Sequence, residues 1–96
     1  MAKKNSEKLE HTETKDDALL EMGKFYFVNG KYDQAIDEFR KAVKINPVKA
    51  EIYYNLGLVY ESKNIVSEAK EMYEKALSIE PNYKLAKEHL ERLVGL

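Results

Sequence analysis

Few side chains in this chain of 96 residues have the type and spacing that catalysis or metal binding requires. There are two histidines, His11 and His89, and no cysteine, which excludes disulfides, thiolate nucleophiles and zinc–thiolate sites. The histidines stand far apart, without the His-x₃-His spacing or the acidic cluster of a metal site. Four scattered glycines form no phosphate-binding loop. We therefore expect no enzyme, no metal and no cofactor.

Seven tyrosines could stack on the bases of single-stranded nucleic acid, but such binding also needs a basic groove. The formal net charge is −1, and acidic side chains outnumber basic ones between residues 50 and 83. This balance favours neither nucleic acid nor an anionic membrane surface as a partner. The apolar runs fall far short of the roughly 20 residues of a membrane helix. We expect a cytoplasmic protein with most tyrosines in its core.

A repeat of 34 residues organises most of the chain, because one shift relates both prolines, Pro47 and Pro81, and also Gly23 and Gly57. The further pairs are Met22 and Leu56, Tyr26 and Tyr60, Ala35 and Ala69, Phe39 and Tyr73, and Ala42 and Ala76. A period of about 20–50 residues predicts a solenoid, in which similar units stack on one another.

Each unit has the apolar spacing of two amphipathic helices. The expected helices span 16–29, 32–45, 50–63 and 66–79, and a fifth begins at 83. Asn29-Gly30 and Lys63-Asn64 separate the helices of each pair, since glycine and asparagine tolerate a positive φ. Each proline disfavours helix in the residue before it and so ends a pair.

The repeated positions resemble the tetratricopeptide repeat, whose signature is W-x₂-L-G-x₂-Y, then A-x₃-F, then P. The first unit has Leu19, Met22-Gly23, Tyr26, Ala35, Phe39 and Pro47 at these positions, and the second has Tyr53, Leu56-Gly57, Tyr60, Ala69, Tyr73 and Pro81. The resemblance covers residues 16–96 and implies an all-α solenoid of tetratricopeptide type. Its expected parts are two antiparallel helical hairpins, 16–49 and 50–83, and a capping helix, 84–96.

Residues 1–15 differ from the repeats in composition. Between Lys3 and Lys15 the only large apolar side chain is Leu9, among charged and hydroxyl residues. Such a segment cannot bury enough apolar surface to offset the entropy of ordering. We expect a disordered tail or a fraying extension of the first helix.

The resemblance implies a protein–protein interaction module that binds a peptide or protein segment on a concave face, formed by the first helix of each pair. The signature residues point into the hairpins, so their neighbours on the first helices should line this groove. These neighbours are Leu20, Lys24, Phe27, Tyr54, Asn55, Leu58 and Glu61. Apolar anchors such as Tyr54 would supply affinity, and polar neighbours would orient the peptide.

Two alternatives remain open. Two and a half repeats fall short of the roughly three needed for independent stability, so the chain could be a structural, self-associating scaffold. Its contact would be the apolar side of the last helix, which holds Leu90, Leu93, Val94 and Leu96. The identity of the partner and the oligomeric state are not determined by the sequence.

The second alternative is a co-chaperone. One similar subfamily clamps the C-terminal carboxylate of heat-shock chaperones with lysine, arginine and asparagine side chains. Asn55 matches such an asparagine. The other clamp positions hold Leu20, Lys24, Leu85 and His89, which departs from the subfamily's pattern.

Overall fold

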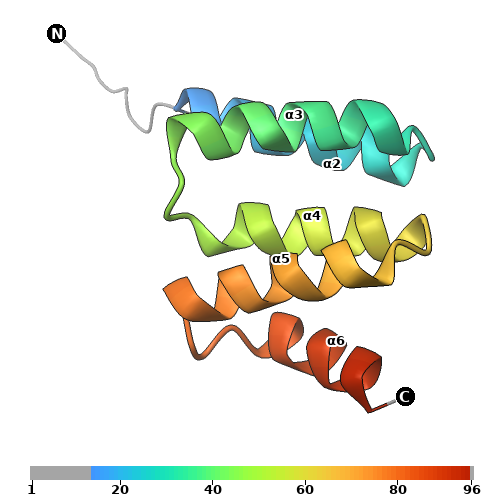
Figure 1. The fold of residues 1–96 in the computed structure, drawn as a ribbon. Coiled ribbons are helices and arrows are strands. Elements are labelled where there is room, and N and C mark those ends of the chain that lie inside the picture. Colours follow the sequence, from blue (N-terminus) through green and yellow to red (C-terminus); the bar gives the residue numbers. More distant parts are fainter. Residues whose placement is uncertain (1–13, 96) are drawn as a thin grey trace, which may run out of the picture.

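The computed structural model describes residues 14–95, which form five α-helices (Figure 1). They are α2 (Lys15–Val28), α3 (Tyr32–Ile45), α4 (Ala50–Ser62), α5 (Val66–Ile79) and α6 (Lys84–Val94). The helices pair as hairpins α2–α3 and α4–α5, and α6 packs on α5. The expected all-α solenoid is confirmed, with helix bounds within one residue of those predicted. Residues 1–13 of the expected tail lie outside the described residues, whereas Lys15 belongs to α2.

The turn inside each hairpin depends on one residue with a positive φ. Gly30 has φ 75° between α2 and α3, and Asn64 has φ 61° between α4 and α5. These are the residues that the sequence indicated, because glycine and asparagine adopt this conformation at the lowest cost. At its other end, α2 begins with Thr14, whose hydroxyl oxygen accepts a hydrogen bond from the Asp17 backbone N–H.

Each hairpin is closed by an aromatic ring that lies against a glycine of the facing helix. A Cβ atom added to Gly23 would lie 2.6 Å from Cδ1 of Phe39, and one added to Gly57 would lie 2.6 Å from Cδ1 of Tyr73. Both rings are completely buried. The two glycines are therefore required for close helix contact, which offsets the roughly 1 kcal/mol that glycine costs a helix relative to alanine.

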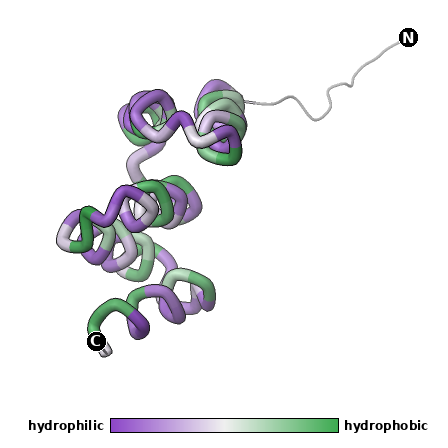
Figure 2. Tube along the Cα trace, turned by 90° about the vertical axis from the view of Figure 1, so that its right-hand side faces the viewer, coloured by the Kyte–Doolittle hydropathy of each residue, from purple (hydrophilic) through white to green (hydrophobic). Residues whose placement is uncertain are grey.

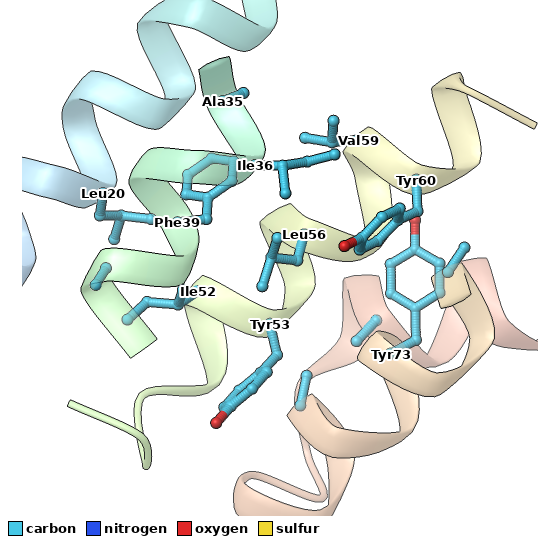
Figure 3. Close-up of a cluster of buried hydrophobic side chains, with 14 of the residues drawn as sticks. Leu20, Ala35, Ile36, Phe39, Ile52, Tyr53, Leu56, Val59, Tyr60 and Tyr73 are labelled. Atoms are coloured by element: carbon cyan, nitrogen blue, oxygen red, sulfur yellow. The ribbon is translucent and has the colours of Figure 1, made fainter. Parts of the chain in front are cut away.

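The second hairpin packs on the first through the face of α4 that meets α3 (Figure 3). This face contains Ile52, Leu56 and Val59, which are 0%, 3% and 0% exposed. At its edge, Arg40 Nη2 of α3 donates a hydrogen bond of 2.6 Å to the Tyr60 hydroxyl. The interface between hairpins is thus apolar in the middle and polar at its rim.

Met22 departs from the expected packing. It occupies the same repeat position as Leu56, yet it is 46% exposed, whereas Leu56 is 3% exposed. Helix α3 covers Leu56, and no helix among residues 14–95 covers the corresponding side of α2.

The last helix buries part of its apolar side. Ala86 is completely buried, and Leu90 and Leu93 pack partly against the core. Val94 is 56% exposed, and Leu96 lies outside the described residues. Within the surface that was expected to support self-association, Leu90 and Leu93 are thus partly buried by the chain itself and Val94 stays exposed.

Candidate functional site

The first helices of the repeats share one side of the molecule. The end-on view in Figure 2 shows α2, α4 and the start of α6 on one side of the stack, with α3 and α5 on the other, and α6 crosses beneath α5 towards its C-terminus. We call the former surface the α2–α4–α6 face. All the predicted groove residues come from α2 and α4, so the periodicity places them on the elements that form this face.

A cluster of aromatic rings joins α4, α5 and the start of α6. The Tyr54 ring lies 5.2 Å from that of Tyr83, 6.0 Å from that of Tyr73 and 5.8 Å from the imidazole of His89, measured between centroids. These separations are typical of favourable aromatic pairs. Tyr54 therefore lies at the centre of the cluster and is held by rings from two other elements.

Beside the rings, the Glu61 carboxylate accepts hydrogen bonds from two helices. The Tyr73 hydroxyl donates to its Oε1 atom at 2.7 Å, and Arg92 Nη2 donates to its Oε2 atom at 2.7 Å. Arg92 Nη2 also lies 2.9 Å from His89 Nδ1. The same His89 nitrogen lies 3.2 Å from Glu61 Oε1. Glu61 thereby links the end of α4 to both α5 and α6.

Two pKa shifts follow from this network. Burial opposes ionisation of Glu61, but the hydrogen bonds from Tyr73 and Arg92 outweigh it, so the pKa of this carboxyl lies below its ordinary value. Burial, together with the bond to Glu61, raises the pKa of the Tyr73 phenol. The carboxylate is therefore charged and the phenol neutral at physiological pH.

Carboxylates surround the partly exposed tyrosines of the cluster. Burial and the charge of Glu51 raise the pKa of Tyr83 to about 12. Burial and the charges of Glu61 and Glu88 raise the pKa of Tyr54. Negative charge near a phenol disfavours the phenolate. Both rings are consequently neutral aromatic surfaces with carboxylates nearby.

Two of the predicted groove residues are buried. Leu20 is 2% exposed and belongs to the hydrophobic core. Asn55 is 8% exposed, and its Nδ2 atom donates a 2.8 Å hydrogen bond to the Glu51 backbone carbonyl within the same helix. Each therefore offers little surface to a ligand and supports the face from beneath.

The other predicted residues are partly exposed. Lys24 Nζ lies 3.2 Å from a carboxylate oxygen of Glu21 and 3.3 Å from one of Glu51, so it links α2 to α4. The Phe27 ring lies 5.8 Å from that of Tyr32 at the turn of the first hairpin, away from the Tyr54 cluster. Leu58 packs partly against the core. The structure thus brings Tyr54 and Glu61 into one cluster and leaves Phe27 outside it.

Sequence reasoning missed two members of the cluster, Tyr83 and Arg92. Arg92 lies 34 residues after the predicted groove residue Leu58, so the repeat shift alone could have placed it on this face. Tyr83 precedes α6 in the link between helices, where helical periodicity makes no prediction about side-chain direction.

Neither a cluster of metal ligands nor a membrane span is found among residues 14–95. Between residues 14 and 95, no group of three histidine or acidic side chains could hold a metal ion. None of the five described helices combines the length and apolar composition of a membrane span. The site is thus an aromatic and acidic surface held by hydrogen bonds.

Comparison with known proteins agrees with this architecture. A family model described as "TPR repeat" matches residues 23–64, and one described as "Tetratricopeptide repeat" matches residues 50–83. The chain belongs to the tetratricopeptide repeat (TPR) family. Among solved structures, this TPR chain is similar to the MamA protein, with a TM-score of 0.80 and 35% identity over 83% of this chain and 44% of that one.

A second solved structure contains a bound peptide. It is the first TPR of Spaghetti (RPAP3) bound to the HSP90 peptide SRMEEVD, with a TM-score of 0.55 and 25% identity over 88% of this chain and 94% of that one. That structure shows that a domain of this type accommodates a peptide.

Relatives of known sequence are much longer than this TPR chain. It is 42% identical to a probable UDP-N-acetylglucosamine–peptide N-acetylglucosaminyltransferase SPINDLY of Hordeum vulgare, over 59% of this chain and 6% of that protein. It is 31% identical to a peroxisomal targeting signal receptor of Candida glabrata, over 77% of this chain and 12% of that protein. The chain spans between 6% and 36% of the length of these two relatives and six others. TPR repeats form protein–protein interaction modules that are generally not catalytic.

Proposed function

We propose that this TPR chain binds an extended segment of another protein on the α2–α4–α6 face, with Tyr54 and Tyr83 as its anchor. The contact between these two rings, 5.2 Å apart, is the observation that carries the proposal. Both rings are half-buried and come from different elements. Tyrosines that are held in place and still partly open are enriched among binding hot spots.

The charges around this anchor select the partner. The carboxylates of Glu51, Glu61 and Glu88 act on the two rings. Two cations on this face have acidic partners, since Lys24 pairs with Glu51 and Arg92 pairs with Glu61. A lysine or arginine of the bound segment would gain both the aromatic face and the carboxylates. The partner is therefore a segment with a basic side chain at the anchor.

The clamp for a C-terminal carboxylate receives less support. Among its positions, Leu20 is buried, and the Asn55 side chain is already bonded to the backbone of Glu51. His89 is in contact with Arg92 and Glu61. An acidic peptide such as SRMEEVD would have to displace these contacts and approach a face that is rich in carboxylates.

A peptide array tests the proposal and does not require an identified partner. The labelled full chain is applied to random heptapeptides and to SRMEEVD, and the affinity of the strongest binders is measured by fluorescence anisotropy. We expect lysine or arginine to be enriched among binders. Truncating Tyr54 to alanine should weaken the binding of these peptides by about 1–3 kcal/mol, the range of an interface hot spot. Helicity should be unchanged, because Tyr54 is only half-buried.

Lys44→Ala is the control, because Lys44 is exposed on α3, on the opposite side of the stack. It should bind the selected peptides like the wild type. The proposal is wrong if Lys44→Ala loses binding while Tyr54→Ala retains it. Enrichment of acidic peptides, with SRMEEVD among the strongest, would instead support the co-chaperone alternative.

A further inference from the structure

Helix α2 carries an exposed apolar stripe on the side that faces away from the second hairpin. Met22 is 46% exposed and Phe25 is 58% exposed. Together with Ala18 and Glu21 they line a shallow depression of about 350 Å³. This stripe lies on a different side of α2 from Lys24, which reaches α4. It is therefore separate from the proposed peptide site.

The second hairpin shows what this position of the repeat accepts. A shift of 34 residues carries Ala18, Met22 and Phe25 onto Ile52, Leu56 and Val59, all of which are buried in the contact with α3. In that contact a helix runs antiparallel to α4 and covers the whole stripe (Figures 1 and 3). The stripe on α2 thus has the position and the chemistry of a helix-packing surface.

We propose that a second copy of this chain covers the stripe, with α2 packed antiparallel on α2 about a two-fold axis near Met22. The competing segment of the chain itself is weaker, because residues 2–13 contain Leu9 as their only large apolar side chain. One leucine cannot replace the apolar contacts that α3 makes with the equivalent face of α4.

The stripe is complementary to itself. An antiparallel pair centred on Met22 brings Phe25 of one copy near Ala18 of the other, so a large side chain meets a small one at both ends. Such an interface is isologous, with the same patch used by both copies. The charge of Glu21, at the edge of the stripe, is balanced by Lys24 of the same helix at 3.2 Å. The approach of two copies is therefore not opposed by uncompensated carboxylates.

The size of the stripe limits the strength of the dimer. Stable complexes bury about 800 Å² on each partner, and one helix face with three apolar side chains provides much less. The dimer is consequently weak and depends on protein concentration.

Disulfide trapping tests the geometry. Because the chain contains no cysteine, an introduced cysteine supplies its only thiol, and any disulfide must join two copies. Met22→Cys is compared with Leu85→Cys on α6, since the native side chains are 46% and 50% exposed. A two-fold axis near Met22 brings two such thiols within disulfide distance, so we expect Met22→Cys to cross-link about ten-fold faster or more under mild oxidation. Equal rates for the two variants would overturn the proposal.

Sedimentation equilibrium of the full chain tests the association itself. Phe25→Lys and Val94→Lys are matched, because the native side chains are 58% and 56% exposed and both stand near a helix C-terminus, where lysine is favourable. We expect the average mass of wild type and Val94→Lys to rise with concentration, and Phe25→Lys to remain monomeric. A monomeric wild type up to millimolar concentration, or loss of association only in Val94→Lys, would contradict the α2 interface.

Discussion

The two hairpins have the same interior and different surroundings. In each, a glycine of the first helix receives an aromatic ring of the second, and an added Cβ would clash with that ring in both cases. Outside this contact the hairpins differ. Val59 of the second hairpin is completely buried, whereas its counterpart Phe25 in the first is 58% exposed.

One repeat therefore encodes its own closure but not its contacts with neighbouring repeats. The contact between Gly57 and Tyr73 involves two helices that are joined by a short turn, so any copy of the motif can form it. The burial of Val59 requires α3 from the preceding repeat. Solenoid stability is accordingly the sum of terms within repeats and terms between adjacent repeats.

Truncation at the repeat position shared by Leu56 and Met22 should show the largest difference in stability between the two hairpins. Leu56→Ala removes a side chain that is 3% exposed and should lower the free energy of unfolding by about 2–5 kcal/mol. Met22→Ala, at a position that is 46% exposed, should cost less than about 1 kcal/mol. Urea unfolding monitored by circular dichroism measures both. Equal losses would mean that α2 is as well covered in solution as α4.

The ring that closes each hairpin offers a smaller contrast, because only Tyr73 carries a hydroxyl. Its bond to Glu61 is 2.7 Å long, so Tyr73→Phe should cost about 1–2 kcal/mol in unfolding free energy. It should also move the pKa of Glu61 towards its ordinary value, since a donor to the carboxylate is lost. Urea unfolding and NMR titration of the Glu61 carboxyl check the two effects.

The reciprocal change, Phe39→Tyr, is the control. The residue that corresponds to Glu61 in the first hairpin is Phe27, which cannot accept a hydrogen bond. The new hydroxyl should therefore destabilise the first hairpin by about 1 kcal/mol or more. A stabilised Phe39→Tyr variant would show that the first hairpin also provides an acceptor for the ring hydroxyl, in contradiction to the structure.

The smallest effect concerns pH and the start of the first hairpin. Asp16 accepts hydrogen bonds from Thr14 and Asn46 and has Lys49 at 3.5 Å, so its pKa is lowered to about 2. Its counterpart in the second hairpin is Ala50, which has no charge. A lowered folded-state pKa contributes stability that is complete above the unfolded value of about 4 and is lost as the pH falls towards 2.

The Asp16→Asn variant should therefore lose less unfolding free energy than the wild type between about pH 5 and pH 2. Above pH 5 the two proteins should show a similar pH dependence. Urea unfolding of both proteins across this range provides the measurement. If the variant loses stability on acidification as steeply as the wild type, the acid sensitivity comes from other carboxyls, such as Glu61.

Much of the fold could be predicted from residue types and spacing alone. The helix pairs of the 34-residue period and the turns at Gly30 and Asn64 depend on interactions within one hairpin. The face that carries the candidate site followed from the resemblance to the tetratricopeptide repeat. Local interactions act over one helical turn or one short link, so the order of residues is enough to specify them.

Side-chain availability was decided only by the tertiary structure. Leu20 and Asn55 have the spacing of groove residues, yet packing buries both, whereas Tyr83 and Arg92 join the site from beyond the second hairpin. Met22 was expected in the core and lies open because nothing among the described residues covers it. Burial depends on which helix lies opposite, and that helix comes from another repeat. Periodicity within one helix determines the direction of a side chain, while only the assembled stack determines what that side chain meets.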